Sequence, residues 1–244
     1  MHYLSIMAIF KNETLNLKIW IEHYLWQGIQ HFYMIDNNST DDPLSIIQPY
    51  IDSKLVSYYF RPKQHDQINH YRTIYAQENL KLKTKWLIIA DLDEFFYGLK
   101  LKICNILPKL QNYDILYCNW LMFGSDGLIE HPNDIRTAII YRNPNYHENK
   151  KYIFQTKNIN ASQILIHHIE PANKFYKKLF INNLIHLNHY PIQSLNYFTQ
   201  VKMTRGDVDT RKSDNIRDLN YFKEYDKNNT IPDDYLKKLI ELNR

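Results

Sequence analysis

The chain has 244 residues, of which 44% are hydrophobic and 23% charged, and its formal net charge is +4 at pH 7. This balance is typical of a globular protein with a buried core, and the length suits one large α/β domain or two small ones. The two cysteines, Cys104 and Cys118, exclude a disulfide framework, and no Cys/His spacing matches a zinc site. The mild positive charge suits an anionic ligand such as a nucleotide, but it suits a surface without a specific partner equally well.

No apolar run approaches the roughly 20 residues that a membrane helix needs. The first apolar segment, HYLSIMAIF, is too short and too uncharged at its front for a signal peptide. These two features predict a chain without a membrane span, located in the cytoplasm of a bacterium or of a virus-infected host.

The first ninety residues alternate strands and helices. Continuous apolar runs predict buried parallel strands at residues 3–10, 31–35, 54–60 and 86–91. Apolar residues at helical spacing predict helices at residues 13–27, 43–51 and 66–82, and Gly28 is expected to end the first of them. Three successive β-α-β passages indicate a parallel sheet with right-handed crossovers, so the predicted fold class is α/β.

The pattern changes after Gly98. A further strand is predicted at residues 113–124, followed by short strands at 137–141, 151–156 and 163–169. From Gln193 the sequence becomes helical and charged to its end. No repeat, low-complexity tract or clear linker divides the chain, which indicates a single domain.

Three carboxylates follow the fourth predicted strand, in the segment WLIIADLDEFF (86–96). Ligands of an open parallel sheet collect beyond the carboxyl ends of its strands, where Asp91 and Asp93 are expected. In an extended chain these two residues share a face and Leu92 points into the core. Hard oxygen ligands at that spacing suit Mg²⁺ or Mn²⁺, although a solvated acidic turn explains the same D-x-D letters.

Four stretches carry a family resemblance in their order and approximate spacing. They are MAIFKNETLNLKIWIEHYLWQGIQHFYMIDNNSTDD (7–42), WLIIADLDEFF (86–96), FGSDG (123–127) and LNHYPIQSLNYFTQVKMTRG (187–206). Together they resemble the GT-A-fold glycosyltransferases of the family 2 and family 92 type. Each short element is weak alone, but the set extends over most of the chain, which makes the resemblance specific.

The resemblance implies the GT-A fold, a Rossmann-like nucleotide-diphospho-sugar transferase fold with a mostly parallel central sheet flanked by helices. Residues 1–98 would form the nucleotide-binding half, residues 99–206 the acceptor half that completes the metal site, and residues 207–244 a C-terminal helical tail. It further implies metal-dependent, inverting transfer of a sugar, with Mn²⁺ or Mg²⁺ as cofactor. The donor would be a nucleotide-sugar such as a UDP-sugar, and the acceptor a glycan, a lipid-linked glycan or a protein.

The same resemblance implies that Asp93 and Asp91 bind the metal, and that Asp91 also contacts the ribose or a metal-bound water. His189 matches a third metal ligand from late in the chain, with the competing candidates His167, His168 and His186. Nucleotide contacts are expected from Lys11, Asn12, Glu13, Asp36, Asn37, Gln67 and Arg72. Glu13 is equally explained by the preference of a helix start for negative charge, and Arg72 by simple exposure on a helix.

The donor diphosphate would be clamped by Lys202 and Arg205, which lie three residues apart on an expected helix, although an unrelated solvated face explains the pair as well. Gly206 directly after them suits the end of that helix. Asp41 has a different explanation, because it precedes the expected helix 43–51 and suits its N-terminal cap.

A carboxylate must take the proton from the acceptor hydroxyl. Asp126 is the first candidate for this base, because Gly124 and Gly127 permit a tight loop that projects it into the cleft, and Glu130 is the second. An aspartate in a glycine-rich turn explains Asp126 equally well.

Two other functions compete with sugar transfer. A nucleotidyltransferase shares a similar sheet and metal site, but its glycine-rich loop after the first strand is missing from IFKNETLN. A non-catalytic nucleotide-binding or nucleic-acid-binding protein is the other, since basic and aromatic residues suit single strands. Lys and Arg are dispersed and no nucleic-acid motif is present, so no nucleic-acid partner is expected. The oligomeric state is open.

Overall fold

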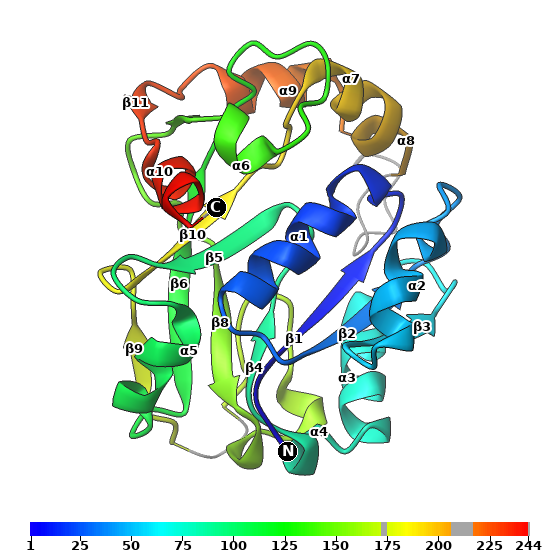
Figure 1. Ribbon diagram of the computed structural model, residues 1–244, viewed down its shortest axis with the longest axis vertical. Helices are drawn as coiled ribbons and strands as arrows, with labels where there is room; N and C mark the ends of the chain where they lie inside the picture. Colours follow the sequence, from blue (N-terminus) through cyan, green and yellow to red (C-terminus); the bar gives the residue numbers. More distant parts are fainter. Residues whose placement is uncertain (172–174, 206–216, 244) are drawn as a thin grey trace.

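The computed structural model describes residues 1–171, 175–205 and 217–243. Its first half is a series of β-α-β units (Figure 1). The elements are β1 (His2–Phe10), α1 (Thr14–Trp26), β2 (His31–Asp36), α2 (Leu44–Asp52), β3 (Val56–Phe60), α3 (Gln67–Gln77), α4 (Leu80–Lys83) and β4 (Thr84–Ile89). The four strands run parallel in the order β3-β2-β1-β4, so the predicted parallel sheet is confirmed.

The second half extends the same sheet with strands of both directions. Its elements are β5 (Glu94–Gly98), α5 (Ile103–Ile106), η1 (Leu107–Leu110), β6 (Ile115–Met122), α6 (Ile135–Ala138), β7 (Tyr141–Arg142), β8 (Lys150–Gln155), η2 (Thr156–Asn158), η3 (Ala161–Gln163), β9 (Lys178–Phe180) and β10 (Ile185–His189). The sheet continues in the order β4-β8-β6-β10-β5, with β9 beside β6. The predicted α/β fold with a mostly parallel central sheet flanked by helices is therefore confirmed.

Short helices follow β10 in the chain. They are α7 (Leu195–Tyr197), the π-helix η4 (Phe198–Lys202), α8 (Met203–Arg205), α9 (Leu219–Asp226) and α10 (Tyr235–Leu242), with β11 (Ile231–Pro232) paired to β7. Figure 1 shows α7 and α8 at the top of the molecule, beyond the carboxyl end of β1. The predicted helix end at Gly206 lies outside the described residues. The division at residues 98 and 206 stays a prediction, although β4 of the first half pairs directly with β8 of the second.

Three predicted elements differ from the structure. Helix 66–82 is interrupted because Asn79 takes a left-handed conformation, with φ of 50°, between α3 and α4. The strand predicted at 137–141 is wrong, since α6 occupies its first half and starts at the cap Asp134, whose side chain accepts from Arg136 N. The strand predicted at 163–169 is also wrong, because this segment forms a loop with one bridge between Ile164 and Ile169.

The core has two halves, one on each face of the sheet. Along β1, Leu4 and Ile6 pack with the residues of α1, whereas Met7 and Ile9 pack with those of α3. This alternation explains the continuous apolar run, because a strand covered on both faces buries every side chain. None of the helices in the described part of the chain has the length and apolar character needed to cross a membrane.

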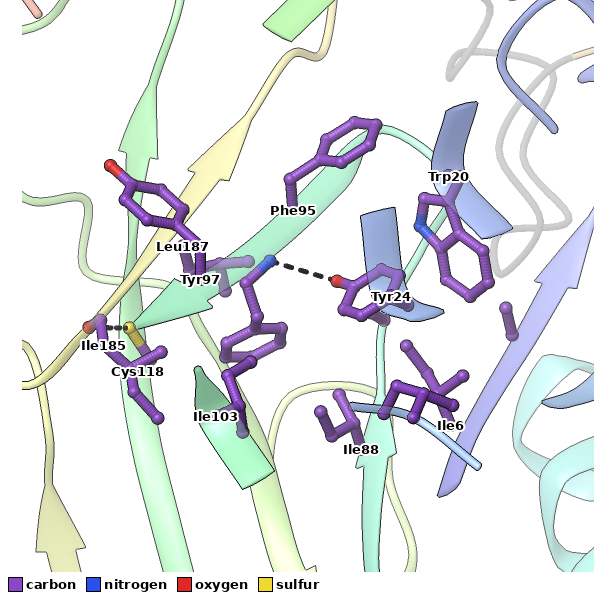
Figure 2. Packing of buried hydrophobic residues seen from close by; sticks show 14 of the residues in the cluster. Ile6, Trp20, Tyr24, Ile88, Phe95, Tyr97, Ile103, Cys118, Ile185 and Leu187 are labelled. Carbon is purple, nitrogen blue, oxygen red and sulfur yellow. Dashed lines mark hydrogen bonds between the residues drawn. The ribbon is translucent and has the colours of Figure 1, made fainter. Parts of the chain in front are cut away.

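Helix α1 is held to β5 by buried side chains. Figure 2 shows Trp20 and Tyr24 of α1 beside Phe95 of β5, and the Tyr24 hydroxyl accepts from Phe96 N at 3.1 Å. The same hydroxyl donates to the carbonyl oxygen of Glu94 at 3.0 Å. Helix α1 therefore fixes the backbone directly after the D-x-D segment.

Candidate functional site

The site lies where the carboxyl ends of β1, β2 and β4 meet the helices that follow β10. Glu13 follows β1, Asp36 ends β2, Asp91 and Asp93 follow β4, and His189 ends β10. The ends of parallel strands leave backbone and loop side chains free of the ladder, which is why ligands of α/β sheets bind at this edge.

The D-x-D segment is a turn, not the extended chain expected from the sequence. Strand β4 ends at Ile89, and Glu94 N donates to the carbonyl oxygen of Asp91 at 3.1 Å. The Glu94 carboxylate also accepts from Asp91 N at 2.9 Å, which closes the turn from its other side. Leu92 is buried as predicted. Because the chain turns between Asp91 and Asp93, the two side chains do not share one face as they would on a strand. They therefore contact different lysines.

Asp93 is buried between a lysine and a histidine. Lys202 Nζ donates to Asp93 Oδ2 at 2.5 Å, and His189 Nε2 lies 3.6 Å from Asp93 Oδ1. Burial opposes ionisation of Asp93, but Lys202 and His189 outweigh it and hold the pKa of this carboxyl well below its usual range. The structure therefore presents an ionised carboxylate at the strand end, next to an imidazole.

Glu13 is also buried and shares its cations with Asp93. Arg205 donates to Glu13 Oε1 at 2.5 Å, Tyr197 donates to Oε2 at 2.6 Å, and Lys202 Nζ lies 3.7 Å away. Burial opposes the charge on Glu13, yet Arg205 and Lys202 lower its pKa from the ordinary value. These contacts go beyond the helix-start explanation of Glu13, and they bring Lys202 and Arg205 together at one carboxylate. Their role as a diphosphate clamp stays a prediction.

Asp91 has a separate partner that the sequence did not indicate. Lys151 of β8 donates to Asp91 Oδ2 at 2.8 Å although its side chain is completely buried. Gln67 donates to Asp91 Oδ1 at 3.5 Å, so this predicted site residue does reach the segment. Glu94 lies 3.8 Å from Lys151, and burial raises the pKa of Glu94 well above its usual range. The adjacent lysines of KKYIFQT were the only signal of Lys151 in the sequence.

The loops after β1 and β2 are tied to each other. Asp36 accepts from Ser39 N at 2.8 Å and from the Tyr58 hydroxyl at 2.6 Å, while Asn37 donates to two carbonyl oxygens of the segment after β3. Asn12 accepts from Thr40 N at 2.8 Å. These predicted nucleotide contacts therefore shape the edge of the site through loop hydrogen bonds.

Asp41 and two predicted basic residues have other contacts. Asp41 does not cap α2 as predicted: it accepts from the backbone and side chain of Thr14, both at 2.9 Å, and so caps α1. Arg72 donates to the carbonyl oxygen of Ile164 at 3.1 Å, on the loop that follows η3. The Lys11 carbonyl oxygen accepts from Arg205, which ties the exit of β1 to α8.

The two base candidates lie on the loop after β6. Asp126 accepts from Ile140 N at 2.5 Å and from Tyr141 N at 3.2 Å, in a left-handed conformation with φ of 51°. Burial raises the pKa of Asp126. Glu130 is exposed and accepts from Asn196 at 2.8 Å. The structure thus gives Asp126 a structural role in this loop and leaves its catalytic role a prediction.

The four histidine candidates separate clearly. His189 contacts Asp93, whereas His186 lies between the hydroxyls of Tyr97 and Tyr146, at 3.3 and 3.2 Å. His168 is exposed. His167 packs against Trp120, and burial together with Lys151 lowers its pKa to about 4. Of the four, His189 is the one that the structure places at Asp93.

The side chains around Asp93 offer Mn²⁺ or Mg²⁺ a partial set of ligands. Within the described residues, no three His, Cys, Asp or Glu side chains converge as a ready metal cluster. Asp93 Oδ1 and His189 Nε2 nevertheless form a two-donor pair, and His189 Nδ1 is buried without a hydrogen-bond partner in the described structure. A divalent ion with two protein ligands completes its shell with water and phosphate oxygens, so the pair fits such an ion. Asp91 as a third ligand stays a prediction.

Known proteins resemble the chain in both sequence and structure. A glycosyltransferase family 92 protein of Ricinus communis is 26% identical over 208 residues, which cover 82% of this chain and 37% of the relative. The chain thus spans little more than a third of that relative's length.

Among solved structures, S. aureus TarS 1-349 in complex with UDP is 14% identical, with a TM-score of 0.43, and the match covers 63% of this chain and 47% of that one. GalNAc-T7 with UDP, GalNAc and Mn²⁺ is 12% identical, with a TM-score of 0.46, and the match covers 77% of this chain and 43% of that one. Likeness at this level is too low to indicate a shared activity. The model of glycosyltransferase family 92, in contrast, matches residues 3–238, and the chain therefore belongs to that family.

Proposed function

We propose that the chain is a metal-dependent, inverting glycosyltransferase that moves a sugar from a nucleotide-sugar, such as a UDP-sugar, to a hydroxyl group of a glycan, lipid-linked or protein acceptor. The observation that supports this most is the ionised, buried Asp93 facing His189 at the carboxyl edge of the sheet. Membership of family 92 supports the reaction class. The cytoplasmic location stays a prediction.

The residues of the site would divide the work of donor binding. Asp93 and His189 would hold Mn²⁺ or Mg²⁺, which supplies Lewis-acid neutralisation of the departing diphosphate when bound. Lys202 and Arg205 would add positive charge to the same side of the donor. Asp36 and Asn37, at the end of β2, would contact the nucleoside, because the loop that they hold lies at the same edge of the sheet.

Inversion requires a base on the acceptor side, and Asp126 remains the first proposal with Glu130 second. Desolvation favours Asp126, because it raises the pKa of the carboxyl toward that of an effective proton acceptor. We expect Asp126→Asn to lower transfer by about a hundredfold or more while Mn²⁺-dependent UDP binding is kept. Glu130→Gln is the matched comparison: if that variant loses transfer and Asp126→Asn does not, the two roles are reversed.

The function is tested by the release of nucleoside diphosphate from a panel of nucleotide-sugars, with Mn²⁺ or with a chelator. Asp93→Asn is expected to lower the release by at least about a hundredfold. Asp52→Asn is the control, because Asp52 is an exposed carboxylate of α2 whose side chain accepts from Gln48. Unchanged release by Asp93→Asn, or release of a sugar 1-phosphate instead of UDP, would contradict the proposal. A sugar 1-phosphate would indicate attack at the α-phosphate, the reaction of a nucleotidyltransferase.

A further inference from the structure

Each aspartate of the D-x-D motif is paired with its own buried lysine. Lys202 Nζ lies 2.5 Å from Asp93 and Lys151 Nζ lies 2.8 Å from Asp91, and the exposed fractions of the two lysine side chains are 2% and 0%. An ammonium group removed from water is stable only beside such a partner. In the free protein, the position next to Asp93 is therefore held by a cation that belongs to the chain.

The charges of this group already balance. Glu13 and Asp93 contribute −2, and Lys202 and Arg205 contribute +2, so the charges of these four side chains sum to zero. A divalent ion on Asp93 would meet the Lys202 ammonium at close range, in surroundings where like charges repel far more than in water. Either Lys202 must leave Asp93, or new negative charge must enter with the ion. A donor diphosphate supplies that charge.

The two lysines differ in how they are attached to the fold. Lys151 belongs to β8, which is hydrogen-bonded to β4 on one side and to β6 on the other. Lys202 is the last residue of the π-helix η4, between the short helices α7 and α8 and outside the sheet. π-Helical turns are short and rare, and they are often found at functional sites. The backbone that carries Lys202 can therefore shift without breaking a strand, whereas the backbone that carries Lys151 is held in the sheet on both sides.

We propose that Lys202 is a displaceable counter-ion of Asp93: it occupies the carboxylate in the free protein and gives it up when a divalent ion and a nucleoside diphosphate bind together, its ammonium then pairing with the diphosphate. This inference rests on the metal site of the proposed function. It predicts weak binding of the ion alone and strong positive coupling between the ion and the nucleotide. It also gives Lys202 a role distinct from that of Arg205, which pairs with Glu13.

The test measures Mn²⁺ binding to the full chain by calorimetry, with and without saturating UDP. We expect UDP to tighten Mn²⁺ binding to the wild type by at least about tenfold. Lys202→Met should bind Mn²⁺ alone at least about tenfold more tightly than the wild type. In this variant, UDP should tighten Mn²⁺ binding by a much smaller factor than in the wild type. Lys18→Met is the matched control, because it removes one positive charge from an exposed pair with Glu22 and leaves Asp93 and its partners unchanged, and we expect it to keep the wild-type coupling.

A second variant covers the case in which Lys202→Met does not fold. Lys202→Arg keeps the charge, and because a guanidinium holds a carboxylate through two N–H groups, it should be harder to displace and weaken Mn²⁺ binding in the presence of UDP. The counter-ion role is wrong if Lys202→Arg binds Mn²⁺ like the wild type, if Lys202→Met gains no affinity for Mn²⁺ alone, or if Lys18→Met gains as much affinity as Lys202→Met. If the wild type binds no Mn²⁺ even with UDP, the metal site of the proposed function fails as well.

Discussion

Asp93 and Glu13 are carboxylates that the fold removes from water and places beside two cations. Such groups contribute little when both partners are present, but loss of one partner leaves a buried charge that typically costs about 3–5 kcal/mol. The sequence resemblance pointed to these two carboxylates, to their cations Lys202 and Arg205, and to His189. It did not name Lys151, because nothing in KKYIFQT distinguishes a buried lysine from an exposed one until Asp91, from a distant part of the chain, lies next to it.

The lowered pKa of Asp93 leads to a prediction about acid stability. A carboxyl whose pKa is lower in the folded protein stabilises the fold above its unfolded value, about 3.9, and this stabilisation is lost as the pH falls through the folded value. Asp93→Asn should therefore lower the free energy of unfolding by about 3–5 kcal/mol at pH 7 and by progressively less below pH ~4. Urea unfolding from pH 7 to pH 3 measures this difference. A difference that stays constant over that range would contradict the pairing of Asp93 with Lys202.

At the scale of elements, β1, β2 and β4 were predictable because each is covered on both faces and is largely a continuous apolar run, as in YLSIMAIF. The same reasoning failed at residues 163–169. There, Ile164 and Ile169 are buried against the α3 side of the sheet while their backbone forms a loop, so apolar residues mark burial without a strand. The turn at Asp91 was missed for a different reason: besides the local contacts of Glu94, it depends on Tyr24 of α1, a distant residue that donates to the Glu94 carbonyl oxygen.

The end of α1 gives an element-scale prediction. Gly28 has a φ of 93°, and a Cβ there would lie 2.4 Å from Cys104 Sγ and 2.6 Å from Cys104 Cβ. Gly28→Ala should therefore lower the free energy of unfolding by about 1–3 kcal/mol, from backbone strain and from the clash. In a Cys104→Gly background, which removes both atoms, the loss should be smaller but should not vanish, because the strain remains. An unchanged unfolding free energy for Gly28→Ala would show that the helix end is not held as described.

At the scale of the whole molecule, one continuous sheet brings together site residues from the parallel first half and from the later strands. The parallel strands β1, β2 and β4 carry Glu13, Asp36 and the D-x-D turn, and the later strands β8 and β10 bring Lys151 and His189 to the same edge. The short helices after β10 then return Lys202 and Arg205 across the end of β1 (Figure 1). The order of strands and helices in the sequence predicted the parallel half. The pairing of β8 with both β4 and β6 joins distant segments and could be seen only in the structure.

The proposed reaction depends on a divalent ion at Asp93 and His189, which would join the protein to the diphosphate of the donor. A crystal structure with UDP and Mn²⁺, measured at the manganese absorption edge, tests this most directly. We predict an anomalous peak in contact with Asp93, His189 and the diphosphate, with Lys202 Nζ moved from Asp93 to a phosphate oxygen. Ordered UDP with no peak at Asp93, or with manganese bound elsewhere, would contradict it.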